Sequence, residues 1–242
     1  MTKAVLFDVD FTLIYPGPMF QGEGYQAFCA RYGIEVDAAL FDQARAAASS
    51  LLDATASTSV YDNDVYVDFT RRIIEGMGGR GDAMTDCARE IYAEWAACHH
   101  FVLYDEVPGA LGALVADGVR VGLVSNSHRC LSTFQTHFGL EGLIDATISS
   151  SEYGLMKPHP GIFAEALRRL GVVPSDAVMV GDSVSHDVEG GLRAGMGAVL
   201  LHRDETPHPL ESSLRDRGVP TIRTLHELST ALRALQPELS AR

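Results

Sequence analysis

The side chains best suited to chemistry in this chain are aspartates that follow short apolar segments. Asp8 and Asp10 come directly after Ala4–Phe7, and Asp182 follows another apolar run. Carboxylates gathered in one small pocket cannot all stay ionised without a counter-charge, and a divalent cation supplies one. Oxygen ligands favour a hard ion, and Mg²⁺ suits a site with few carboxylates, particularly where a substrate phosphate completes its shell. These residues therefore predict a Mg²⁺ site.

Lys157 is the cation that we expect beside these carboxylates. It is one of only two lysines among 242 residues, the other being Lys3. An ammonium group there would hold a carboxylate nucleophile and the oxygens of a phosphate together. Ser125 and Asn126 end another apolar segment, where they contact a ligand, cap a helix expected from about His128, or do both.

Short apolar segments alternate with helix-like segments along most of the chain. This alternation predicts a parallel α/β sheet with crossover helices, and continuous apolar strands fit burial on both faces of that sheet. Ligands of such a sheet bind at the carboxyl ends of its strands, where the polar residues above would lie. The expected strands are Ala4–Phe7, Val119–Val124, Ala146–Ser149, Ala177–Val180, Ala198–Leu201 and Thr221–Leu225.

The long interval from residue 16 to residue 100 has a different pattern. It predicts helices and no strand, and it begins where two prolines and a glycine form a natural exit from the sheet. We therefore expect an α/β core of residues 1–15 and 101–242, with an all-helical cap inserted at 16–100. The helices expected in the cap are Gly24–Tyr32, Ala38–Asp53, Asp64–Gly76 and Ala83–Cys98.

Composition narrows the classes of partner. The formal net charge is −13, from 19 basic and 32 acidic residues, which argues against binding a nucleic-acid backbone. The apolar start is too short for a signal peptide and no run reaches membrane-spanning length, so we expect a cytoplasmic protein without a membrane partner. The four cysteines show neither zinc-site nor disulfide spacing. A small phosphorylated ligand stays possible, because a metal ion and a few helix N-termini can overcome the overall negative charge locally. Monomer and homodimer both stay open.

Taken in order, the four polar segments resemble the motifs of the haloacid dehalogenase-like (HAD) superfamily. Asp8–Thr12 resembles its first motif, Val124–Asn126 the second and Lys157–Pro158 the third, while Gly181–Asp187 with Gly195 resembles the fourth. The resemblance covers nearly the whole chain. It implies the branch with a doubly wound, Rossmann-like core and a helical cap inserted after the first strand, and hydrolysis of a small phosphomonoester with Mg²⁺.

The same resemblance implies a role for each matching residue. Asp8 would be the nucleophile that forms an aspartyl-phosphate, and Asp10 the general acid and base. The implied catalytic residues are Asp8, Asp10 and Lys157. The implied substrate-binding residues are Thr12, Ser125, Asn126 and Lys157, and the implied metal ligands are Asp8, Asp10 through its carbonyl, Asp182, and Asp187 as the residue that orients the shell.

Two positions admit more than one interpretation. Phe11 stands where the family usually has glycine, which is favoured where φ is positive or the backbone approaches a ligand. Phe11 therefore implies either an unstrained turn or a narrowed pocket mouth. Asp187 either orients the metal shell or caps the helix that runs through Leu192.

Other functions of the same fold remain as alternatives. A carbon–halogen hydrolase of the 2-haloacid dehalogenase type is disfavoured by Asp10, because a leaving halide needs no proton. A phosphosugar mutase is hard to separate from a phosphatase by sequence, and a catalytically silent binding module is disfavoured by the retained aspartates and Lys157. Imine chemistry on the cap is excluded, since no lysine lies between Ala4 and Met156.

Overall fold

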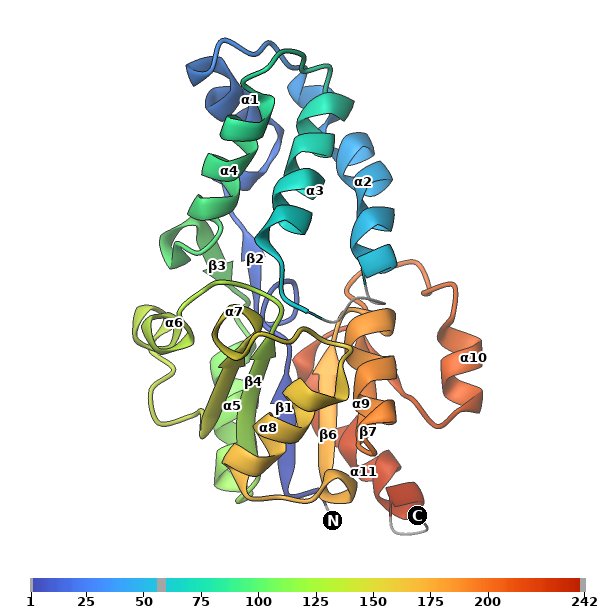
Figure 1. Ribbon diagram of the computed structural model, residues 1–242. Coiled ribbons are helices and arrows are strands. Elements are labelled where there is room, and N and C mark those ends of the chain that lie inside the picture. Colours follow the sequence, from blue (N-terminus) through green and yellow to red (C-terminus); the bar gives the residue numbers. More distant parts are fainter. Residues whose placement is uncertain (1, 56–59, 240–242) are drawn as a thin grey trace. The chain divides into compact units, whose positions relative to one another are not determined.

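The computed structural model describes residues 2–55 and 60–239 of the chain. The chain divides into two compact units. One consists of Met1–Tyr15 and Leu103–Arg242, and the other of Pro16–Val102. The first contains a six-stranded sheet flanked by helices and the second is built of helices (Figure 1).

The sheet of the first unit is wholly parallel, with strand order β5-β4-β1-β6-β7-β8. This confirms the expected α/β class. Phe7 at the end of β1 pairs with Leu123 of β4 and Val180 of β6, so Asp8 emerges level with the ends of both neighbouring strands. The strands are β1 (Ala4–Phe7), β4 (Arg120–Ser125), β5 (Ala146–Ser149), β6 (Ala177–Gly181), β7 (Gly197–Leu201) and β8 (Thr221–Ile222).

Helices cover both faces of this sheet (Figure 1). Side chains alternate along a strand, so Ala4 and Leu6 of β1 pack with Phe163 and Leu167 of α8 on one face. α5 and α11 lie on the opposite face (Figure 1). The α-helices are α5 (Val107–Ala116), α6 (Leu131–Phe138), α7 (Ser150–Tyr153), α8 (Pro160–Leu170), α9 (Glu189–Arg193), α10 (Glu211–Asp216) and α11 (Leu228–Leu239). The short helical turns are η4 (Pro174–Asp176), η5 (Val184–Val188) and η6 (Leu225–Glu227), of which η5 is a π-helix.

The second unit has the expected helical character. The helix predicted over residues 83–98 ends earlier, at Glu94, and the one predicted from residue 38 begins as a short turn capped by the Asp37 side chain. The α-helices are α1 (Gly22–Arg31), α2 (Phe41–Thr55), α3 (Asn63–Gly76) and α4 (Met84–Glu94). The short turns are η1 (Pro18–Phe20), η2 (Ala38–Leu40) and η3 (Cys98–His100).

A two-stranded sheet of β2 (Ile14–Pro16) and β3 (Phe101–Leu103) was not predicted. Its strands are three residues long, too short for a pattern of alternating polarity. The last predicted strand is also shorter than expected, because Thr224 and Glu227 form a capping box that starts η6. Across the described ranges 2–55 and 60–239, every helix is too short or too polar to cross a bilayer.

Candidate active site

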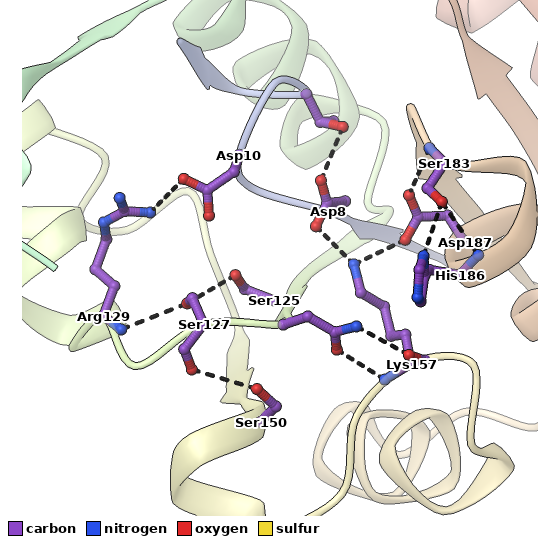
Figure 2. Close-up of polar contacts among 12 residues, drawn as sticks. Asp8, Asp10, Ser125, Ser127, Arg129, Ser150, Lys157, Ser183, His186 and Asp187 are labelled. Carbon is purple, nitrogen blue, oxygen red and sulfur yellow. Dashed lines mark hydrogen bonds and ion pairs between the residues drawn. The ribbon is translucent and has the colours of Figure 1, made fainter. Parts of the chain in front are cut away.

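Asp8 lies at the centre of a group of polar residues at the carboxyl ends of the parallel strands (Figure 2). Its main-chain N–H donates to the carbonyl of Val180 at 2.9 Å, which continues the ladder between β1 and β6. The Lys157 ammonium donates to Asp8 Oδ1 at 2.6 Å, and the Thr12 hydroxyl donates to Oδ2 at 3.2 Å. Both oxygens of the carboxylate are therefore oriented by the protein.

Lys157 binds a second carboxylate. Its Nζ lies 2.7 Å from Asp187 Oδ1, and only 2% of the Lys157 side chain and 1% of the Asp187 side chain are exposed. Asp187 Oδ2 accepts a hydrogen bond from the main-chain N–H of Ser183 at 3.0 Å. Because Asp187 lies inside η5 and both of its oxygens are engaged here, it is a buried partner of Lys157 and not the cap of the helix that follows.

Asn126 fixes the main chain of Lys157. Its side-chain amide donates to the Lys157 carbonyl at 2.9 Å, and its side-chain oxygen accepts from the Lys157 N–H at 2.7 Å. Ser125 is buried, and its hydroxyl donates to the Ser127 hydroxyl at 2.9 Å. The alternative that Ser125 and Asn126 cap a helix is wrong, since α6 begins at Leu131 and the preceding residue is Cys130.

The acidic residues could bind a cation together. Asp8, Asp182 and Asp187 each offer a carboxylate oxygen, and these oxygens lie within 4.8 Å of one another. The side chain of Asp182 is the one with substantial solvent access. Hard oxygen donors around an excess of negative charge are the ligand type that Mg²⁺ prefers, so the donor set fits this ion.

The pKa values of these residues reflect the same excess of carboxylate groups. Burial raises the pKa of Asp8 from its usual 3.8 to about 6; Lys157 opposes this effect and Asp187 adds to it. Loss of hydration within the site is the largest effect that raises the pKa of Asp182, and the negative charges of Asp8 and Asp187 raise it further. Burial alone would lower the pKa of Lys157, but Asp187 and Asp8 outweigh burial and raise it. Lys157 is therefore a fixed cation, and the carboxylates would gain from another positive charge.

Asp10 points toward a different partner. Its Oδ1 accepts a hydrogen bond from Arg129 Nη1 at 2.8 Å (Figure 2). The Arg129 side chain is 0% exposed and that of Asp10 is 18% exposed. Arg129 was not predicted from the sequence, because a single arginine beyond a strand carries no spacing signal.

Thr12, predicted as a substrate-binding residue, is fully buried and contacts Asp8. Its carbonyl accepts a hydrogen bond from Arg203 at 2.8 Å. Arg203 also pairs with Glu106 at 2.7 Å and lies over the ring of Tyr104, 3.5 Å from the ring centroid. Residue 12 is thus held at both its hydroxyl and its carbonyl, beside the Asp8 carboxylate.

The backbone conformation of Phe11 excludes one of the two interpretations of this position. It adopts φ +63°, and it is the single non-glycine residue with positive φ in the described part of the chain. The unstrained turn is therefore wrong: the backbone keeps the left-handed conformation that suits glycine, at a cost of about 1–2 kcal/mol. Its N–H donates to the Ile14 carbonyl at 2.7 Å, which closes the turn.

The helical unit holds a second group of potential metal ligands, Glu94, His99 and His100. His100 Nε2 already lies 3.0 Å from Glu94 Oε2, and the His100 ring packs edge-on against Phe20. This hydrogen bond and ring contact give a structural reason for the proximity of Glu94 and His100.

The chain is similar to known hydrolases and phosphatases. A family model described as a haloacid dehalogenase-like hydrolase matches residues 2–195. Mouse haloacid dehalogenase-like hydrolase domain-containing protein 3 is 35% identical over 153 residues, which cover 63% of this chain and 59% of that protein. The chain thus matches less than two thirds of that relative's length. Mouse N-acylneuraminate-9-phosphatase is 30% identical over 218 residues, which cover 87% of this chain and 86% of that protein.

The chain also superposes on solved structures over nearly its whole length. A HAD phosphatase from Thermococcus onnurineus superposes with a TM-score of 0.62 at 27% identity, covering 96% of this chain and 98% of that chain. A 2-haloacid dehalogenase from Pseudomonas syringae pv. Tomato DC3000 superposes with a TM-score of 0.62 at 26% identity, covering 96% and 99%. Because both kinds of enzyme share this fold, the choice of reaction depends on the residues of the site.

Proposed function

The chain belongs to the haloacid dehalogenase-like hydrolase family, and we propose that it is a Mg²⁺-dependent phosphatase that hydrolyses a small phosphomonoester through an aspartyl-phosphate. One observation carries this proposal. Asp8 is held by Lys157 and Thr12, and a second carboxyl group, that of Asp10, follows two residues later and is bound by Arg129. The similarity to phosphatases of the family supports it.

In the first step, an Asp8 carboxylate oxygen attacks phosphorus and the bond between phosphorus and the ester oxygen breaks. Asp10, in its protonated form, donates its proton to that ester oxygen, so an alcohol leaves. Lys157 offsets negative charge beside the Asp8 carboxylate. Ser125, at the end of β4, is the proposed contact for the phosphoryl oxygens.

In the second step, water attacks phosphorus and Asp10 accepts a proton from that water. The bond between phosphorus and Asp8 breaks, which releases inorganic phosphate and restores the Asp8 carboxylate. Asp10 ends protonated, ready for the next substrate, so protons balance over the cycle.

Asp8, Asp182 and the Asp10 carbonyl would hold Mg²⁺, and the ion would neutralise charge on the phosphoryl group when bound. Asp187 would act behind these ligands, because its oxygens contact Lys157 and the Ser183 N–H. Asn126 would act in the same indirect way, by positioning the main chain of Lys157.

A 2-haloacid dehalogenase is the second candidate, since a solved structure of that type superposes on nearly the whole chain. Such a reaction displaces halide from carbon and needs no general acid. The carboxyl group of Asp10, two residues after Asp8, has a role in the phosphatase reaction and none in the dehalogenase reaction, so it favours the phosphatase. A phosphosugar mutase would need a second sugar phosphate as acceptor in place of water. We further propose that the substrate is a small phosphorylated metabolite, that the protein acts in the cytoplasm, and that it is a monomer or a homodimer.

The test is release of phosphate from a panel of phosphorylated sugars, sugar acids and short alkyl phosphates, including N-acylneuraminate 9-phosphate. We expect turnover with Mg²⁺, none after treatment with EDTA, and none for Asp8→Asn. Asp10→Asn should lose about 10²–10⁴-fold in kcat. Asp216→Asn, on the exposed side of α10, is the matched control and should keep full activity. Halide release from 2-chloropropionate without phosphate release from the panel would refute the proposal.

A further inference from the structure

Arg129 is the largest fully buried side chain in the described part of the molecule. It lies in the segment between β4 (Arg120–Ser125) and α6 (Leu131–Phe138), and its guanidinium donates to Asp10 at 2.8 Å across 119 residues of sequence. Taking a guanidinium out of water costs several kcal/mol unless it is paired and hydrogen-bonded. The burial of Arg129 therefore depends on the partners that its guanidinium binds.

The two cations of the site serve different carboxylates. Lys157 lies within 2.7 Å of Asp8 and Asp187, whereas Arg129 forms an ion pair with Asp10. In Figure 2, the Asp10 carboxyl group turns toward Arg129 and away from Asp8. The proposed nucleophile and the proposed acid–base residue are thus oriented by separate cations.

The segment that carries Arg129 is itself fixed by hydrogen bonds. The buried Ser127 hydroxyl accepts from the Ser125 hydroxyl at 2.9 Å and from the Arg129 main-chain N–H at 3.4 Å. The Ser150 hydroxyl donates to the Ser127 carbonyl at 3.4 Å. A guanidinium with one fixed position gives the carboxyl group that it binds one preferred rotamer.

We propose that Arg129 is a positioning residue for Asp10, an inference that rests on the proposed phosphatase function. It holds the Asp10 carboxyl group in one orientation, ready to approach the ester oxygen in the first step and the water in the second. Arg129 is itself buried, so it acts through Asp10 and not by contact with substrate. A displacement of about 1 Å in a reacting group can cost about 10²-fold in rate.

This role predicts a dependence on the leaving group. With an alkyl phosphate, the leaving oxygen needs the proton of Asp10, so Arg129→Met should lower kcat/KM by about 10²-fold. With p-nitrophenyl phosphate, the leaving group needs little protonation, and kcat/KM should fall by less than about 10-fold. The second step still needs Asp10, so the phosphoryl group should accumulate on Asp8 during turnover of p-nitrophenyl phosphate. An acid quench would trap this phosphoenzyme for measurement.

The decisive measurement combines Arg129→Met with Asp10→Asn. Since Arg129 acts through Asp10, the double variant should be no slower than Asp10→Asn alone. Arg129→Lys keeps the charge and should recover part of the activity with alkyl phosphates, and it decides the matter where Arg129→Met does not fold. Arg169→Met is the matched control: this arginine pairs with Glu165 at 2.9 Å on α8, and its loss should leave the leaving-group dependence unchanged.

Equal losses with both leaving groups, or a further loss when Arg129→Met is added to Asp10→Asn, would overturn the inference and leave the proposed function intact. A wild-type protein that hydrolyses no phosphomonoester would overturn the proposed function, and the role of Arg129 with it. Leaving-group dependence together with no added loss in the double variant would support both.

Discussion

Replacing Lys157 by methionine removes an ammonium group that lies between two buried carboxylates. Its Nζ is 2.6 Å from Asp8 Oδ1 and 2.7 Å from Asp187 Oδ1, and the Asp8 and Asp187 side chains are 11% and 1% exposed. Breaking a buried ion pair by removing one partner costs about 3–5 kcal/mol, because a charge is left uncompensated. We therefore expect Lys157→Met to lose about 3–5 kcal/mol of unfolding free energy, measured in EDTA at pH 8.

Asp187→Asn provides the second arm of a double-mutant cycle. The asparagine can still accept from the Ser183 N–H, so the single variant should lose about 1–3 kcal/mol. In the Lys157→Met background the same change removes an unpaired charge and should cost little or restore stability. The losses should be non-additive by at least about 1 kcal/mol, within the usual range for residues in direct contact.

Acidic pH should reduce the penalty of Lys157→Met. The pKa of Asp8 is raised to about 6 in the folded wild type, so its protonation favours the folded state, an effect lost as pH rises through about 6. Removing Lys157 raises that pKa further, since Lys157 opposes the shift. The difference in stability between variant and wild type should therefore be smaller at pH 5 than at pH 8.

Urea unfolding followed by circular dichroism, with equal m-values for all variants, measures these differences. Lys3→Met is the matched control, because the other lysine also pairs with an aspartate, Asp176 at 2.7 Å, but is 65% exposed. Its loss should cost about 0–1 kcal/mol. A loss below about 1 kcal/mol for Lys157→Met, or additivity within about 0.5 kcal/mol in the cycle, would refute this reasoning.

Three further predictions concern the turn, a thiol and the metal. Phe11→Gly should be about 1 kcal/mol more stable than Phe11→Ala in urea unfolding, because only glycine adopts φ +63° without strain; equal stabilities would contradict this. Cys130 is the exposed cysteine, and its hydrogen bond with Ser132 lowers the pKa of its thiol to about 7. Iodoacetamide should therefore alkylate it with a rate that rises with pH through about 7, ahead of the three buried cysteines in peptide mapping; faster labelling of a buried cysteine would be the contrary result. Mg²⁺ at 100 times its Kd should add about 2.7 kcal/mol of unfolding free energy, and Asp182→Asn should remove most of that gain; an unchanged gain would exclude Asp182 as a ligand.

The sequence alone determined the α/β class and the edge of the sheet at which polar residues gather. Alternation of apolar strands with helical segments is a local pattern, and in a parallel sheet the carboxyl ends of the strands share one edge. Asp8, Ser125 and Asp182 could therefore be expected near one another without knowledge of any contact. The helical character of the interval after the first strand could also be predicted, because helical spacing is a local pattern that extends over many residues.

Tertiary structure decided how these residues are paired. The bond between Arg129 and Asp10 spans 119 residues and the bonds between Asn126 and Lys157 span 31, and no local spacing encodes such contacts. Thr12 was assigned to the substrate from its place in a motif, yet packing buries it against Asp8. Which carboxylate meets which cation depends on side-chain directions that are set only when the strands and their connecting segments pack together.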